Sequence, residues 1–169
     1  MKQALLLLAR LFLGGSFLVL GLAKVSGDPI FDGKPYPESF SGYVQDTLSE
    51  DGHPVGLWRP VLQWVVRPFP GPFAALVGWG EVVLGLSLLL GALVTFGAIW
   101  GIFLMTVLQL SENPFGGGGP LWTKVAGLLG HGCVALVLAF LAVHGAGRFV
   151  GLDAVLFRRG GKPPPRPVP

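Results

Sequence analysis

The sequence predicts an all-α, membrane-embedded four-helix bundle with an exterior capping loop that contains short helices. Of the 169 residues, 51% are hydrophobic and only 12% are charged, which is too little charge to cover the surface of a soluble domain of this length. The charges are also segregated, because Glu81 is the only charged residue between positions 73 and 110 and positions 125–147 carry none. Long apolar stretches of this kind predict segments that cross a bilayer.

The length of each apolar stretch sets the number of spans. A helix needs ~20 apolar residues to cross the hydrocarbon core, and it rises ~1.5 Å per residue. The stretch from 73 to 110 would reach about twice that thickness, so it is predicted to fold as a hairpin that turns at Gly91-Ala92. The predicted spans are therefore 4–25, 73–91, 93–110 and 122–144.

The long segment between the first two spans, residues 26–72, is polar and rich in proline and glycine. It is predicted to hold two short helices, one that begins around Pro37 and one with Pro60 in its first turn. The second helix carries tryptophans and is expected to lie along the membrane surface. The four glycines from Gly116 to Gly119 predict a flexible connector before the last span.

The distribution of cations predicts the orientation in the membrane. Basic residues surround the chain ends, whereas the 26–72 loop has more acidic than basic residues, so the loop is expected outside and both termini in the cytoplasm. The cations form no stripe with interleaved aromatic residues, and no nucleic-acid partner is expected. The chain is thus divided into a transmembrane domain over 1–157 and a disordered, basic, Pro-rich cytoplasmic tail over 158–169.

The cysteine and glycine contents limit the chemistry that can be expected. A single cysteine, Cys133, leaves no pair for an intrachain disulfide or a CxxC motif, and no metal or nucleotide site is predicted. Gly97 and Gly101 form a GxxxG pair, which is typical of close helix packing in membranes. Whether this pair packs the monomer or a homo-oligomer stays open.

Ionisable residues inside the predicted spans are the candidates for function, because each is costly in a bilayer without a partner. Counted along the helices, Glu81 and His131 come to about the same depth from the outer surface. A carboxylate and an imidazole at one level can relay protons or hydrogen-bond a quinone carbonyl, so these two are the predicted catalytic residues. An outward-opening quinone or substrate pocket is expected from Arg10, Lys24, Trp79, Gln109 and Trp122.

Structural interpretations of the same residues remain open at this point. Glu81 can be one half of a buried ion pair that holds the bundle together. His131 can be a hydrogen-bonded interior residue. Arg10 can reach Glu81 with its long side chain, or extend to the inner headgroups without a further role.

Four motifs follow one another along the chain. They are the opening helix with Arg10, Gly15, Phe17, Gly21 and Lys24, the run GEVVLGLSLLLG from Gly80 to Gly91, the insert that ends at 65–68, and the closing segment from Gly145 to Asp153. In this order and spacing they resemble the DoxX family of small four-helix membrane proteins. The resemblance is strongest to the branch that contains the DoxD-type small subunit of thiosulfate:quinone oxidoreductase.

The resemblance implies a membrane subunit of a redox system in a prokaryotic plasma membrane. Such a subunit would interact with quinone in the bundle and receive electrons from a sulfur substrate through a second redox subunit or a soluble oxidoreductase. The sequence contains no flavin motif and no cysteine pair, so it leaves open whether the chain is an enzyme or only part of a thiosulfate:quinone oxidoreductase. The alternative is a non-catalytic membrane anchor or assembly partner for a soluble oxidoreductase.

Overall fold

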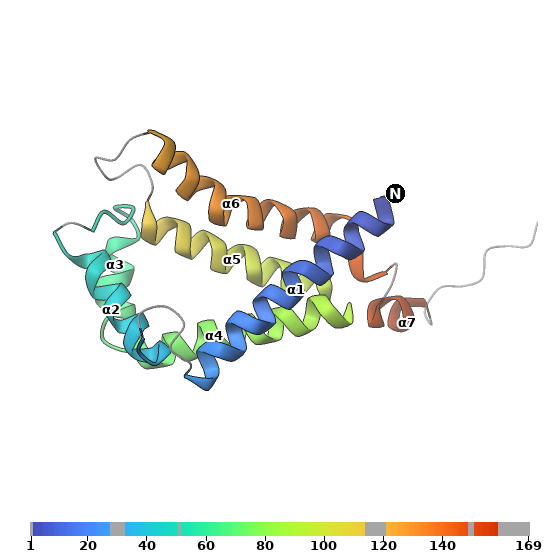
Figure 1. Ribbon diagram of the computed structural model, residues 1–169, viewed down its shortest axis with the longest axis horizontal. Coiled ribbons are helices and arrows are strands. Elements are labelled where there is room, and N and C mark those ends of the chain that lie inside the picture. The colour runs from blue at the N-terminus through green and yellow to red at the C-terminus, as the bar shows by residue number, and fades with distance from the viewer. Residues whose placement is uncertain (1, 28–32, 51, 114–120, 149–150, 159–169) are drawn as a thin grey trace, which may run out of the picture.

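The computed structural model describes residues 2–27, 33–50, 52–113, 121–148 and 151–158 (Figure 1). Every regular element in these ranges is a helix, which confirms the predicted all-α class. The elements are α1 (Lys2–Ser26), α2 (Tyr36–Leu48), α3 (Arg59–Val61), the π-helix η1 (Leu62–Val66), α4 (Pro70–Leu90), α5 (Val94–Glu112), α6 (Leu121–Val143), the 3-10 turn η2 (Ala146–Arg148) and α7 (Leu152–Arg158). The predicted glycine connector and the tail from residue 159 lie outside the described residues.

Four helices of the described part are long and apolar enough to cross a membrane, in agreement with the predicted bundle. The candidate spans are Gln3–Ser26, Pro70–Leu90, Val94–Glu112 and Lys124–Val143. The second helix begins earlier than the expected residue 73, because Pro70 and Pro72 fall in its first turn, where a missing N–H costs nothing.

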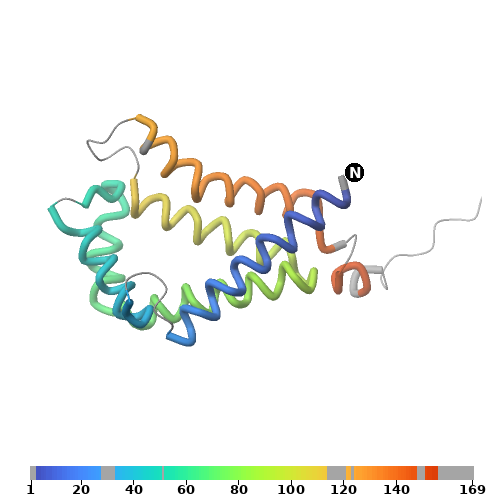
Figure 2. Tube along the Cα trace, in the orientation of Figure 1, coloured from blue at the N-terminus to red at the C-terminus, as the bar shows by residue number. Residues whose placement is uncertain are grey.

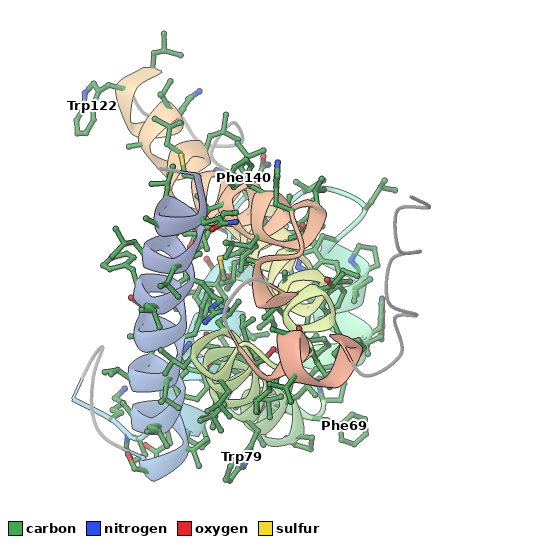
Figure 3. All side chains as sticks on the ribbon, turned by 90° about the vertical axis from the view of Figure 1, so that its right-hand side faces the viewer. Phe69, Trp79, Trp122 and Phe140 are labelled. Atoms are coloured by element: carbon green, nitrogen blue, oxygen red, sulfur yellow. The ribbon has the colours of Figure 1, made fainter. Side chains whose placement is uncertain are left out.

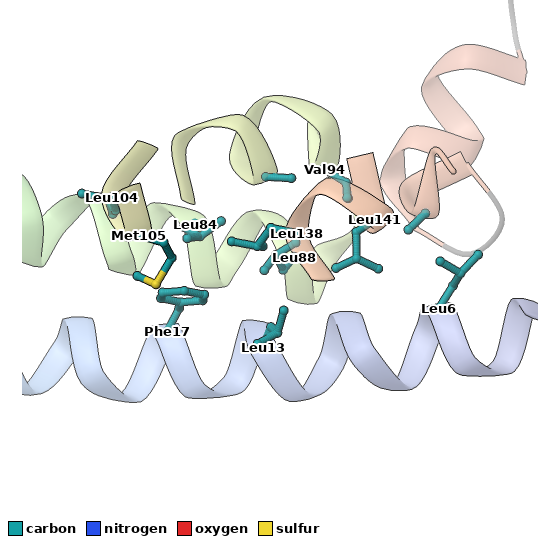
Figure 4. Packing of buried hydrophobic residues seen from close by; sticks show 12 residues of the cluster. Leu6, Leu13, Phe17, Leu84, Leu88, Val94, Leu104, Met105, Leu138 and Leu141 are labelled. Atoms are coloured by element: carbon teal, nitrogen blue, oxygen red, sulfur yellow. The ribbon is translucent and has the colours of Figure 1, made fainter. Parts of the chain in front are cut away.

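The most extensive helix contact joins α4 to α1 from about Gly14 onward, and α5 lies between α4 and α6 (Figure 2). Gly21 of α1 and Gly85 of α4 both permit a close approach of these helices, since a Cβ atom at Gly21 would lie 2.6 Å from the backbone nitrogen of Val82 and one at Gly85 would lie 2.5 Å from that of Leu18. Leucines from α4 and α6, including Leu84 and Leu138, fill the centre together with Phe17 of α1 (Figure 4).

One end of the bundle, here called the hairpin end, is formed by the turn between α4 and α5 and by α7. The turn lies at Gly91, where the sequence predicts it, with φ of 66° at Gly91 and 53° at Leu93. Asp153 of α7 caps α5, because its Oδ1 accepts a hydrogen bond from the Leu93 N–H at 2.8 Å and its Oδ2 one from Val94 at 3.1 Å. The Asp153 N–H in turn donates to the Gly91 carbonyl at 2.9 Å.

The opposite end, here called the cap end, is covered by α2, α3 and η1. Val44 of α2 packs with Leu62 and Val66 of η1 in a small core of its own. The Val55 N–H donates to the Leu110 carbonyl at 2.9 Å, which attaches this cap to the end of α5. Both predicted short helices are therefore present, and the second one continues into the π-helix.

Candidate functional site

A buried ion pair joins the first two spans near the cap end. Lys24 Nζ donates to Glu81 Oε1 at 2.5 Å, and the two side chains are only 10% and 4% exposed. Gly21 lies one turn before Lys24, and its lack of a side chain brings the α1 backbone against α4 at Glu81. The structure thus brings together two of the residues that the sequence singles out.

The second oxygen of Glu81 is left unused. Oε2 is buried and has no hydrogen-bond partner among the described residues. A buried acceptor of this kind usually finds a partner, because leaving it unpaired costs about 1–3 kcal/mol. The pair therefore keeps one acceptor position available beside an ammonium group.

Tyr36 of α2 covers the ion pair from the cap end. Its ring centroid lies 5.1 Å from Lys24 Nζ, a cation–π distance. Burial, followed by the negative charge of Glu81, raises the pKa of the Tyr36 phenol, so the hydroxyl keeps its proton. Tyr36 is not among the residues predicted from the sequence, where its only signal is that Tyr36, Phe40 and Tyr43 share one face of the short helix.

His131 of α6 is paired with Glu112 at the end of α5. The Nδ1 atom lies 3.2 Å from Glu112 Oε2, and the side chains are 26% and 41% exposed. Burial and then the negative charge of Glu112 raise the pKa of the Tyr43 phenol in α2. Glu112 is not among the residues predicted from the sequence, because a carboxylate at the end of a predicted span is usually solvated.

Gln109 lies one turn before Glu112 on the same face of α5. Both of its amide atoms are buried and without a hydrogen-bond partner among the described residues. On the neighbouring side of this helix end, Trp58 Nε1 donates to Ser111 Oγ at 2.8 Å. The cap end of α5 therefore carries the unpaired amide group of Gln109 next to the hydrogen bond between Trp58 and Ser111.

Arg10 lies toward the hairpin end instead of beside Glu81. Its Nη1 donates to the Ala146 carbonyl at 3.1 Å, and the residue is 3% exposed. Gly21, which contacts Glu81, is about 16 Å farther along α1 at the usual rise per residue. The expectation that Arg10 reaches Glu81 is wrong, because a backbone carbonyl that the sequence does not reveal binds the guanidinium.

Trp79 and Trp122 do not line an interior pocket in the structure. They are 56% and 70% exposed and project from the outer surface of the bundle (Figure 3). A tryptophan in an apolar helix fits equally well at a lipid-facing position, where its ring prefers the headgroup zone. Periodicity alone does not distinguish these two placements.

Comparison with known proteins identifies a family. Residues 5–113 match the family model described as DoxX, which extends from α1 to the end of α5 and includes Lys24, Tyr36 and Glu81. No curated protein and no solved structure matches the chain. The family match covers more than half of the sequence.

Proposed function

The chain belongs to the DoxX family and is an integral membrane protein, and from this premise we propose that it is a subunit of a redox system that binds quinone at the Lys24–Glu81 ion pair. The unpaired Oε2 of Glu81 carries this proposal. Ionisable residues inside membrane spans commonly mark substrate or proton pathways. A quinone ring carries two carbonyl oxygens, and the ammonium of Lys24 is a donor for one of them.

The proposed reaction reduces quinone to quinol, which takes up two electrons and two protons. Both electrons come from a partner subunit. Glu81, beside Lys24, is the proposed carrier of protons to the quinone oxygens. His131 and Glu112 lie at the same end of the bundle as the cap and are the proposed entry for protons, and Gln109 is the proposed additional hydrogen-bond partner of the ring.

We propose a reduced sulfur compound, such as thiosulfate, as the electron donor. The similarity of the four sequence motifs to the DoxD-type branch supports this choice. Because the chain has one cysteine, Cys133, the sulfur chemistry is assigned to a second redox subunit or a soluble oxidoreductase. The acidic 26–72 loop supports an exterior cap end, with both termini in the cytoplasm of a prokaryotic cell.

The alternative is a non-catalytic anchor or assembly partner. The favouring observation is that Lys24 and Glu81 neutralise each other and join α1 to α4, as a purely structural pair would. In addition, the outward face of α2 exposes polar residues such as Glu38 and Asp46 to a soluble partner. An anchor would retain that partner in mild detergent and bind no quinone.

The test is binding of duroquinone to the purified protein in nanodiscs. Glu81→Gln is expected to weaken binding by about tenfold or more, whereas Glu50→Gln, at an exposed position beyond α2, is expected to stay within about twofold. The double variant Lys24→Met with Glu81→Leu leaves no unpaired charge in the bundle and is expected to fold. A loss of duroquinone binding in this variant therefore reflects the missing side chains and not unfolding. Wild-type protein that binds no duroquinone, or binding that Glu81→Gln leaves unchanged, would favour the anchor.

A further inference from the structure

Tyr36 forms the third side of the Lys24–Glu81 site, next to the walls contributed by α1 and α4. Lys24 and Glu81 come from spans, but Tyr36 comes from the cap helix α2, with its ring 5.1 Å from the ammonium. Because the paired side chains are almost fully buried, this ring takes part of the space at the cap-end side of the pair. A ligand that approaches from the cap would meet Tyr36 first.

The side chain of Tyr36 has the chemistry of a quinol ring. Tyrosine carries a flat phenol with one hydroxyl, and a quinol is the same ring with a second hydroxyl in the para position. The face of such a ring attracts an ammonium group. Burial and the charge of Glu81 raise the pKa of the Tyr36 phenol, so it stays neutral, as a quinol does.

Tyr36 is the first residue of α2, and the helix start is held by hydrogen bonds from the Glu38 and Ser39 N–H groups to the Pro35 carbonyl. The Tyr36 ring contacts that of Phe40 one turn later, with 5.9 Å between the ring centroids. Val44 in the second half of the helix is 1% exposed and is held in the core of the cap. The movement required of Tyr36 is therefore a rotation of its side chain away from Lys24, at the expense of its contact with Phe40, with α2 kept in place by Val44.

We propose that Tyr36 is a built-in competitor, a phenol of the chain that occupies the position of the quinol ring at the Lys24–Glu81 pair and moves aside when the ligand binds. This inference rests on the proposed function and adds to it that the free site is closed by a side chain of the protein itself.

The first test compares duroquinol binding among variants in nanodiscs. Tyr36→Ala is expected to bind about tenfold more tightly than the wild type, because the competing ring is gone. Tyr36→Phe keeps the ring, and Gln45→Ala changes an exposed residue of the same helix, so both are expected to stay within about threefold. Equal or weaker binding by Tyr36→Ala would overturn the inference, since the ring would then be a wall of the site or irrelevant to it.

The second test needs no quinone and measures acetylation of Lys24 by a membrane-impermeant amine reagent, with exposed Lys34 as the internal reference. Tyr36→Ala is expected to raise the Lys24 rate by about tenfold over Tyr36→Phe. An unchanged rate would show that Tyr36 does not cover the pair, which overturns the competitor but leaves quinone binding to Glu81 standing. A raised rate with no duroquinol binding in any variant would overturn the proposed function and the competitor together.

Discussion

Two buried carboxylates, one at the hairpin end and one in the middle of α4 beneath the cap, are used in different ways. Asp153 at the hairpin end is 5% exposed, and its two oxygens accept the N–H groups of Leu93 and Val94. Glu81 toward the cap end is 3% exposed, and it binds Lys24 with one oxygen while the other has no partner among the described residues. The first carboxylate is fully used to build a turn, and the second keeps acceptor capacity.

This difference separates a folding role from a binding role. A buried carboxylate whose two oxygens accept backbone amides lowers the free energy of the fold and leaves nothing for a ligand. A buried carboxylate oxygen without a hydrogen-bond partner departs from the usual pairing of buried polar groups. Such departures are expected at functional sites. The following predictions test whether the two ends differ as described.

The largest expected effect is that of Lys24→Met. Removing the ammonium leaves the charge of Glu81 buried and unpaired, which should lower the free energy of unfolding by about 3–5 kcal/mol. The measurement is reversible unfolding in mixed micelles. Adding Glu81→Leu should restore most of the loss, and a single variant as stable as the wild type would contradict a buried, charged pair.

Asp153→Ala should lower the free energy of unfolding by about 2–4 kcal/mol, because two N–H groups at the start of α5 lose their acceptors. Asp153→Asn keeps one acceptor oxygen and should lose about half as much. The same unfolding assay measures both variants. Duroquinone binding by the folded variants should not change, and a parallel loss of binding would remove the distinction between the two ends.

Gly21→Ala should cost about 1–3 kcal/mol, because the added methyl group meets the α4 backbone at 2.6 Å and separates α1 from Glu81. Gly15→Ala is the matched control on the same helix, with nothing within 4 Å of the added atom. That control should be neutral or stabilising by up to about 1 kcal/mol. Equal effects of the two changes would show that Gly21 does not set the helix contact at the site.

The smallest expected effect is that of His131→Gln. The His131 and Glu112 side chains are 26% and 41% exposed, so their pairing should contribute less than about 1 kcal/mol to the free energy of unfolding. Unfolding of the variant in 0.05 M and 0.5 M salt measures this contribution and its screening. A loss several times larger would make this pair a second structural link like Asp153.

The fold could be predicted because it depends on the lengths of apolar runs and on a few turn residues. Residues 73–110 exceed one membrane thickness, and Gly91 offers the positive φ that ends α4. The bounds of α4 differ from the prediction only because prolines are tolerated in a first turn. None of these inferences requires knowledge of which helix packs against which.

The site could be predicted only in part, because it depends on those helix contacts. Lys24 and Glu81 stand out as charges in apolar helices, but their pairing follows from the approach of α1 to α4 at Gly21. Tyr36 lies in the cap, and nothing in its local pattern indicates that it folds back onto Lys24. The partner of Arg10 could not be predicted either, because the Ala146 carbonyl is a backbone group that leaves no signal in the sequence.

The cap on α5 also sets an order of events during synthesis. Leu93 and Asp153 are 60 residues apart in the chain, so the ribosome adds the acceptor roughly 3–12 s after the donor at ordinary elongation rates. Until then the α4–α5 hairpin has two amide groups without their final partner. The α4–α5 turn is therefore completed only after the segment around Asp153 has been made, and until then its folding depends on water or on other groups to bind these two amides.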